Sequence, residues 1–288
     1  MSLDLDGKII IINKPPGHTS HEITTFVKKI TGVKRTGHAG TLDPEVSGVL
    51  PIALGRATKL LSYIAAKDKT YVGIIKFKIP KTKREIEELF EKFKGQITQT
   101  PPKISAVRKV PRKRTIYSLK VLEVKGNIAL FETRVDAGTY IRTLCEDIGK
   151  LCGGARMEEL RRTAVGKISE EQTFTMYELI DALWFRDNKN DETMLKKMIN
   201  SPEKYIDLTK AHIKMSALQS ICNGAQIMVP AIEEIENMAE VRKGQLLALY
   251  SGGVFFGVGL IQCDGNEIPK KTHGTVIKTQ RIHKPTGL

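Results

Sequence analysis

Asp43 is the residue of this chain best suited to covalent chemistry. It stands in the run Gly37-His38-Ala39-Gly40-Thr41-Leu42-Asp43-Pro44-Glu45-Val46-Ser47-Gly48-Val49-Leu50, which is rich in glycine and ends in apolar residues. Glycine adopts backbone angles closed to other residues and lets a substrate approach the main chain, and Pro44 stiffens the chain after the aspartate. A carboxylate accepts a transient covalent bond and can leave again. The run predicts a loop that presents Asp43 as a nucleophile, and the alternative is an ordinary Asp-Pro turn.

Two further side chains carry groups that could serve in a binding or catalytic site. Tyr71, in Lys69-Thr70-Tyr71, offers a flat stacking face and a hydroxyl, although it would also serve as a strand aromatic of the core. Arg142, in Gly138-Thr139-Tyr140-Ile141-Arg142, has a guanidinium fork that can hold a carboxylate in one orientation. The alternative for Arg142 is a solvated position on a helix face.

The run around Asp43 resembles the signature of the TruB/dyskerin family of RNA pseudouridine synthases, and the resemblance covers residues 8–185 and, more weakly, 206–285. It implies that Asp43 attacks the target uridine, at the base or at the sugar carbon, so that the base detaches, rotates and rejoins through carbon. It implies that Tyr71 stacks on the flipped base and helps to remove the proton from its carbon, and that Arg142 pairs with Asp43. Neither a metal nor a diffusible cofactor is implied, and a target base must leave its stack to enter the pocket.

The same resemblance assigns roles around the substrate. His38 matches a histidine associated with base flipping and pocket shape, and Lys14 matches the lysine of a Lys-Pro element that supports the site or the phosphate backbone. Leu160 matches an apolar residue that completes the pocket opposite the tyrosine, while Gly40 and Leu42 shape the loop. The alternatives are a plain surface lysine for Lys14 and simple core packing for Leu160.

The charge distribution indicates a polyanionic partner. The 288 residues include 46 Lys and Arg against 32 Asp and Glu, a net charge of +14. Residues 208–288 hold nine basic and six acidic side chains, so +11 of this charge lies in residues 1–207. Residues 103–120 carry seven basic and no acidic side chains, which predicts either a solvated loop or a phosphate clamp. The candidate RNA-binding residues are Lys103, Arg108, Lys109, Arg112, Lys113, Arg114, Arg161 and Arg162.

Hydrophobic periodicity and turn residues predict the elements that carry these side chains. Thr19 and Glu22, and again Thr175 and Glu178, form capping boxes that predict the starts of two helices. The expected helices lie at 20–31, 54–66, 84–94, 140–151, 176–185 and 216–222, and the expected strands at 8–12, 71–79, 118–124, 128–135, 246–250 and 254–261. Residues 186–193 are polar and are expected to form an irregular segment after the helix that ends at Phe185.

From about residue 205 short segments around glycines replace the longer ones, which predicts a small β-rich domain. Residues 206–285 resemble the RNA-binding β-barrel domain called PUA. We therefore expect an α+β protein: a catalytic domain over 1–204, with a mixed, mostly antiparallel sheet, flanking helices and a thumb loop at about 101–118, and a PUA domain over 205–288. The segment before the first strand is shorter than the N-terminal extension that packs against the PUA domain in relatives, which leaves the docking of that domain open.

Two branches of the family compete for this chain. Thr19-Ser20-His21-Glu22 and Pro101-Pro102 with Ser105-Ala106-Val107 resemble the archaeal enzymes directed by H/ACA guide RNA. The partners implied are a guide RNA, a ribosomal or transfer RNA substrate, and small zinc-ribbon, glycine-arginine-type and kink-turn-binding proteins. The alternatives are a stand-alone enzyme for the T-loop of transfer RNA and an RNA-binding scaffold without chemistry. Four cysteines without a CxxC pair, and no apolar run long enough for a membrane, favour a cytoplasmic protein with reduced thiols.

Overall fold

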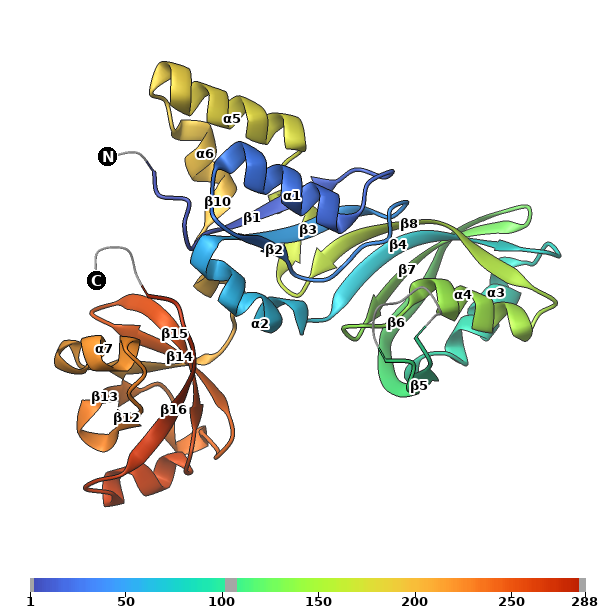
Figure 1. Cartoon of the computed structure of the whole chain (residues 1–288). Coiled ribbons are helices and arrows are strands. Elements are labelled where there is room, and N and C mark those ends of the chain that lie inside the picture. The colour runs from blue at the N-terminus through green and yellow to red at the C-terminus, as the bar shows by residue number, and fades with distance from the viewer. Residues whose placement is uncertain (1–2, 102–107, 285–288) are drawn as a thin grey trace.

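The computed structural model describes residues 3–101 and 108–284, which form two sheets with helices packed against them (Figure 1). Within these residues the larger sheet has ten strands in the order β10-β1-β3-β8-β4-β7-β6-β5, with β2 beside β3 and β9 beside β8. Its pairs are antiparallel except for β3 and β8. The strands are β1 (Ile9–Lys14), β2 (Thr36–His38), β3 (Ser47–Leu54), β4 (Lys69–Phe77), β5 (Gly95–Gln99), β6 (Arg112–Lys125), β7 (Ile128–Val135), β8 (Ala155–Val165), β9 (Ile168–Ser169) and β10 (Ile199–Asn200).

Helices cover this sheet in two groups (Figure 1). One group, α1, α5 and α6, lies over β1 and β3, and the other, α3 and α4, packs against β6 and β8. Both expected capping boxes are present, at the starts of α1 and α5. The helices of the described chain are α1 (Ser20–Thr31), α2 (Leu61–Ala65), α3 (Lys83–Glu91), α4 (Ile141–Lys150), α5 (Met176–Lys189), α6 (Thr193–Met198) and α7 (Met215–Cys222).

Two expectations about helices were wrong. The segment 54–66 is not one helix, because strand β3 runs to Leu54 and a 3₁₀ turn over Gly55–Leu60 precedes the short α2. Gly55 has φ +55°, and a side chain there would meet the carboxylate of Asp6, so the chain turns before it can start a regular helix. In the other case α5 continues four residues past Phe185, with basic residues in its last turn and Asn190 as a left-handed cap.

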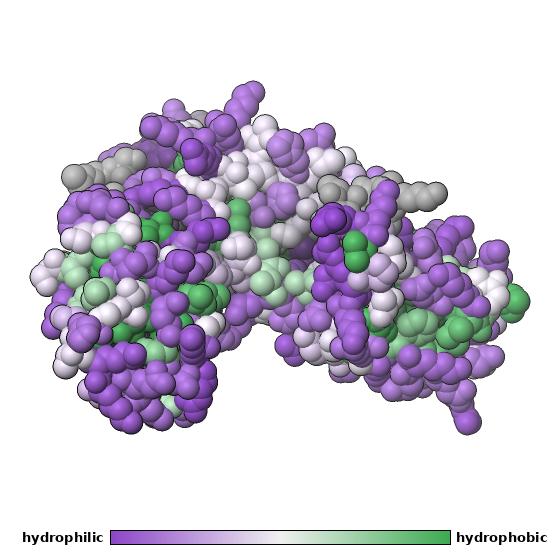
Figure 2. Space-filling view, turned by 60° about the horizontal axis from the view of Figure 1, so that its bottom comes forward, coloured by the Kyte–Doolittle hydropathy of each residue, from purple (hydrophilic) through white to green (hydrophobic). Residues whose placement is uncertain are grey.

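The second sheet has six strands in the described residues, in the order β12-β16-β15-β14-β11-β13. The expected hairpin is formed by β14 and β15 around Gly252 and Gly253. The two sheets meet through one apolar cluster, in which Ala57 and Leu60 pack with Ile206 and Phe255. Figure 2 shows polar side chains over most of one face and a hollow between the two lobes. The strands are β11 (Thr209–Ile213), β12 (Ile227–Met228), β13 (Ile232–Ile235), β14 (Leu246–Ser251), β15 (Val254–Ile261) and β16 (Thr275–Ile282).

Candidate active site

Asp43 lies in the loop that joins β2 to β3, and the surrounding chain holds the backbone of this loop. The hydroxyl of Ser20, the first residue of α1, accepts a hydrogen bond from the Leu42 N–H at 2.8 Å and donates one to the Leu42 carbonyl at 3.1 Å. On the other side of the aspartate, Lys14 Nζ donates to the Pro44 carbonyl at 2.9 Å. Asp43 itself is half-buried, with 46% of its side chain exposed. The loop is therefore fixed on both sides of a carboxylate that solvent or a ligand can reach.

The expected ion pair between Asp43 and Arg142 is present. Arg142 Nη2 donates to Asp43 Oδ2 at 2.6 Å, and the arginine lies in the first turn of α4. A buried glutamine of β5, Gln99, fixes the start of that helix: the Tyr140 N–H donates to Gln99 Oε1 at 3.0 Å, and Gln99 Nε2 donates to the Tyr140 carbonyl at 3.1 Å. Sequence reasoning missed Gln99, because a single glutamine in a polar segment belongs to no motif.

The apolar side of the site comes from three elements. Tyr71 on β4 is 8% exposed and belongs to the same packed cluster as Leu42 of the loop. Leu160 on β8 packs against this cluster. The structure thus places Leu42, the residue before Asp43, in one apolar cluster with Tyr71, and Leu160 packs against that cluster. Such a combination of apolar lining and a few polar groups is typical of small-molecule and base-binding pockets.

Three cations are buried behind the loop. Lys14, Lys69 and Arg162 are 0%, 5% and 1% exposed, and within the described chain none of them lies within 4 Å of a carboxylate. Backbone carbonyls bind them instead: Arg162 Nε donates to Val49 at 2.8 Å and its Nη2 to Gly40 at 3.0 Å. Burial lowers the pKa of Lys69 to about 8 and lowers that of Lys14, and the charge of Arg162 acts in the same direction on both.

The position of Arg162 corrects the expectation that it contacts RNA phosphates. Its guanidinium is inside the protein and bonds to the loop, because β8 is a central strand that turns this side chain inward. Burial lowers the pKa of Arg162, and interaction with Tyr71, its direct partner across the β4–β8 pair, raises it. A side chain at Gly40 would lie 3.3 Å from Arg162 Nη1, and one at Gly48, which has φ +104°, would lie 2.1 Å from the Arg162 carbonyl oxygen. Gly48 is therefore required by the close approach of the Arg162 backbone, and Gly40 by its own φ of +98°.

His38 ends β2, just before the loop. Burial lowers its pKa below the ordinary value, and the nearby Arg162 and His21 lower it further. The imidazole is therefore neutral at pH 7, which suits contact with an uncharged base better than the donation of a positive charge.

The basic segment predicted as a phosphate clamp is partly within the described residues. Lys103 lies outside them. Arg108, Lys109 and Lys113 are exposed, while Arg112 and Arg114 are half-buried. Arg161 has contacts within the protein: its Nε donates to Glu170 at 2.7 Å and its Nη1 to Asn13 at 3.2 Å, although 37% of its side chain is exposed.

In residues 3–101 and 108–284 no three acidic, histidine or cysteine side chains are grouped closely enough to hold a metal ion. In the same residues no helix has the length and apolar character needed to cross a membrane.

Comparison with protein families agrees with this geometry. Residues 28–85 and 78–141 match the TruB family pseudouridylate synthase N-terminal domain, 142–207 match the tRNA pseudouridylate synthase B C-terminal domain, and 209–283 match the PUA domain. The chain belongs to the TruB family. It is a pseudouridine synthase, an isomerase that acts on RNA.

Relatives of similar length support this membership of the TruB family. The chain is 38% identical over 281 residues to a protein of Pyrobaculum calidifontis named "Probable tRNA pseudouridine synthase B", with 96% of this chain and 84% of that protein covered. It is 40% identical over 288 residues to a protein of the same name from Methanosarcina barkeri, with 98% and 84% covered.

Two solved structures of TruB-like chains have the same fold. One is described as "Crystal Structure of a Cbf5-Nop10-Gar1 Complex", with a TM-score of 0.89, 36% identity and 98% of this chain and 86% of that chain covered. Another is described as "Structure of H/ACA RNP bound to a substrate RNA containing 2'-deoxyuridine", with a TM-score of 0.87, 34% identity and the same coverage. The expected α+β architecture with a C-terminal PUA domain is confirmed.

Proposed function

We propose that Asp43 is the nucleophile of this pseudouridine synthase. The observation that carries the proposal is the 2.6 Å contact between Asp43 Oδ2 and Arg142 Nη2 on a loop whose backbone is fixed on both sides. The carboxylate forms a bond to the uridine, at the sugar C1′ or at the base C6. The C1′–N1 bond breaks, the base rotates within the pocket and a C1′–C5 bond forms. C5 then loses its proton and N1 takes one up, so that the product is an isomer of the uridine. Release of Asp43 returns the carboxylate unchanged.

The neighbouring residues have distinct roles in this proposal. Arg142 holds the carboxylate in one orientation while the base approaches it, as a guanidinium does for any carboxylate that it binds directly. Tyr71 stacks on the detached base with its ring, and its hydroxyl helps to remove the C5 proton by passing its own proton on as it takes that one up. Leu42 and Leu160 exclude water from the rotating base, whose hydrolytic escape would end the reaction.

The substrate in this proposal is ribosomal RNA selected by an H/ACA guide RNA. The structural similarity supports this choice, because 98% of this chain superposes on chains from two solved complexes with TM-scores of 0.89 and 0.87. The first complex is described with Nop10 and Gar1, and the second is an H/ACA RNP bound to a substrate RNA. Residues 1–204 would carry the chemistry and residues 205–288 would bind the guide, with partners of the Nop10 and Gar1 kind on the catalytic domain. The second candidate, a stand-alone transfer-RNA enzyme, is favoured by the names of the two archaeal relatives described above.

One set of assays tests these proposals. The purified chain is incubated with a ribosomal RNA fragment, with and without a matching guide RNA and the small proteins, and separately with a synthetic T-arm hairpin, and pseudouridine is quantified. Conversion that depends on the guide supports the first candidate, and efficient conversion of the bare hairpin supports the second. Asp43→Asn should abolish conversion of either RNA without loss of RNA affinity. Asp181 is an exposed carboxylate on α5, and Asp181→Asn should leave the conversion unchanged. Conversion of uridine by Asp43→Asn at the wild-type rate would refute the assignment of Asp43 as the nucleophile.

A further inference from the structure

A cavity of about 660 Å³ lies between α1 and the hairpin that β2 forms with β3, called the β2 hairpin below. Three cations line it, one near the C-terminal end of α1 and two in the segment that follows the helix. Two imidazoles and four threonine hydroxyl groups complete the polar lining, and no described residue that lines it is acidic. The lining residues are His21, Thr24, Thr25, Lys28, Lys34, Arg35, Thr36, Gly37, His38, Thr58 and Leu61.

The local fold builds this cavity. Residues 21, 24, 25 and 28 share one face of α1, because they are spaced at i, i+3, i+4 and i+7. Gly32, with φ +71°, ends the helix in the left-handed conformation and turns the chain back along that face. The Arg35 carbonyl then accepts a hydrogen bond from the Gly55 N–H at 2.7 Å, and Thr36 Oγ1 donates to the Thr24 carbonyl at 3.1 Å. The backbone on both sides of the cavity is therefore fixed before any ligand arrives.

The cations of this cavity are not neutralised by the protein. Lys28, Lys34 and Arg35 form no ion pair with a carboxylate in the described parts of the chain. The neighbouring Glu22 is used by its own helix, since its carboxylate accepts the Thr19 N–H at 2.7 Å in the capping box. Three like charges around one concave surface, with no acidic side chain in its described lining, favour an anion.

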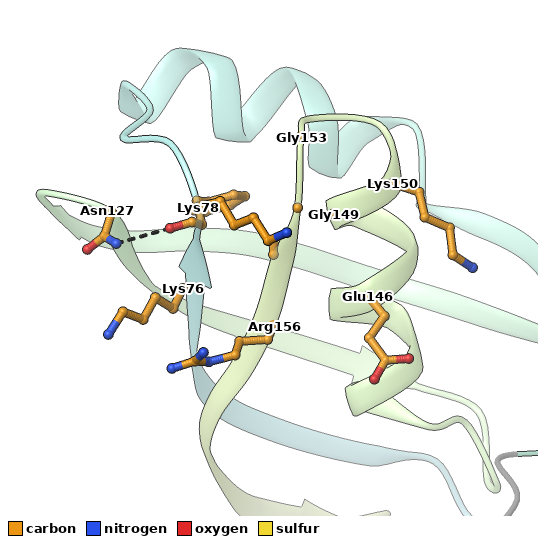
Figure 3. Close-up of a pocket in the computed structure, with 11 residues that line it drawn as sticks. Lys76, Lys78, Asn127, Glu146, Gly149, Lys150, Gly153 and Arg156 are labelled. Carbon is orange, nitrogen blue, oxygen red and sulfur yellow. Dashed lines mark hydrogen bonds between the residues drawn. The ribbon is translucent and has the colours of Figure 1, made fainter.

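A second cavity gives the contrast. It has a volume of about 540 Å³ and lies between the ends of β4 and β8 and the C-terminal part of α4 (Figure 3). Its cations include Lys76 and Arg156, which project from the strands and both pair with Glu158. Lys150 projects from the helix and pairs with Asp147 at 2.6 Å. Basic residues at this end of the molecule are thus largely compensated, and a carboxylate, Glu146, lines the cavity itself.

We propose that the cavity between α1 and the β2 hairpin binds a backbone phosphate of the RNA strand that carries the target uridine. His38 lines the cavity and ends β2, and the loop that presents Asp43 begins at the next residue. We therefore assign the bound phosphate to a nucleotide that flanks the flipped one. Lys34 and Arg35 provide the charge, and the Thr25 hydroxyl provides a neutral donor. This inference rests on the proposed function, because it requires that the substrate is RNA and that Asp43 lies at its target.

The test uses whichever RNA the wild-type chain converts in the assays above, so that failure of the proposed function is seen before this experiment begins. The variant Lys34→Gln/Arg35→Gln removes two charges from the cavity, and Lys78→Gln/Lys150→Gln removes two charges from the cavity of Figure 3. Dissociation constants are measured by fluorescence anisotropy between about 50 and 200 mM salt. The first variant should bind roughly tenfold more weakly, with the slope of log K against log salt smaller by about 1, and the control should match the wild type.

A phosphate scan locates the contact. Single methylphosphonates, which are uncharged, replace each phosphate within three nucleotides of the target uridine. One position should weaken binding to the wild type, and the same substitution should have no further effect on Lys34→Gln/Arg35→Gln. If that double variant unfolds, Lys28→Gln on α1 replaces it, with thermal unfolding as the check. Additive effects at every position would overturn the inference, and so would unchanged RNA affinity with a loss of binding to a partner protein.

Discussion

His283 lies where the end of the second sheet meets the start of the chain, and its protonation should weaken that junction. Its backbone N–H donates to the Phe256 carbonyl at 2.8 Å, and its imidazole ring lies against Phe255 and close to Gly7. Only 8% of the residue is exposed. Burial lowers the pKa of His283 to about 4, with the positive charge of Arg56 as the next cause.

The magnitude follows from proton linkage. The unfolded chain binds a proton at His283 below about pH 6.5, and the folded chain does so only below about pH 4. Between these values the unfolded state holds more protons, so the free energy of unfolding falls as the pH falls. The pKa difference of about 2.5 units at 1.36 kcal/mol per unit corresponds to about 3 kcal/mol in all, of which about 2 kcal/mol is lost between pH 7 and pH 5.

The assay is urea-induced unfolding of the wild type and of His283→Gln at pH 7 and pH 5, followed by circular dichroism. Carboxylates contribute equally to both proteins, so the difference between their pH responses isolates the histidine. The wild type should lose about 2 kcal/mol more than the variant over this interval, and NMR titration of the imidazole should give a pKa well below 6.5. Equal pH responses of the two proteins, or an NMR pKa near the ordinary value, would refute the reasoning.

Three substitutions test the residues around Asp43. Arg142→Lys keeps the charge but loses the guanidinium fork, so the single-turnover rate of pseudouridine formation should fall about 10- to 100-fold. Arg142→Gln should lower this rate further. The free energy of unfolding of both variants should stay within about 1 kcal/mol of the wild type, because the Asp43–Arg142 pair is partly exposed. Arg162→Met should lower kcat by about 100-fold with little change in RNA affinity, since it frees the Gly40 carbonyl and lets the loop move. Weakened RNA binding at unchanged kcat would instead restore Arg162 as a phosphate contact. Gly48→Ala should lower the free energy of unfolding in urea by about 3 kcal/mol or more. Gly95 also has a positive φ but open space around it, so Gly95→Ala should lower the same quantity by about 1 kcal/mol. Equal losses for the two glycines would show that the close approach of β8 is not the cause.

Local patterns in the sequence predict many of the helices and strands. The capping boxes at Thr19 and Thr175 marked helix starts correctly, because they depend on residues three positions apart. The segment 54–66 was misread because its apolar residues suit a helix, while its first turn is decided by a contact with Asp6, which is far away in the sequence. Register and long-range contacts of this kind are not encoded in a local window.

The residues of the candidate site divide in the same way. The sequence predicted the contact between Asp43 and Arg142 through a motif, although the two residues are 99 positions apart. The sequence led us to expect Arg162 at the surface, because the pattern Arg161-Arg162 does not show whether either side chain faces solvent or the interior. Arg161 and Arg162 point to opposite sides of β8, and only the second side chain enters the core, a distinction set by the alternation of a central strand. Gln99 had no signal at all, because its role depends on where β5 meets α4.

The buried cations show how stability and activity are balanced in this fold. Burying Lys14, Lys69 and Arg162 away from carboxylates is unfavourable for folding, since each charge loses its hydration and gains only carbonyl oxygens. A core of apolar residues would be more stable, but it could not donate hydrogen bonds to Pro44, Gly40 and Val49. Those bonds fix the backbone around Asp43 from one side while its carboxylate stays half-exposed and bound to Arg142. A nucleophile that must attack and then leave needs a rigid backbone and an accessible side chain, and Lys14 and Arg162 supply the rigidity without covering the side chain.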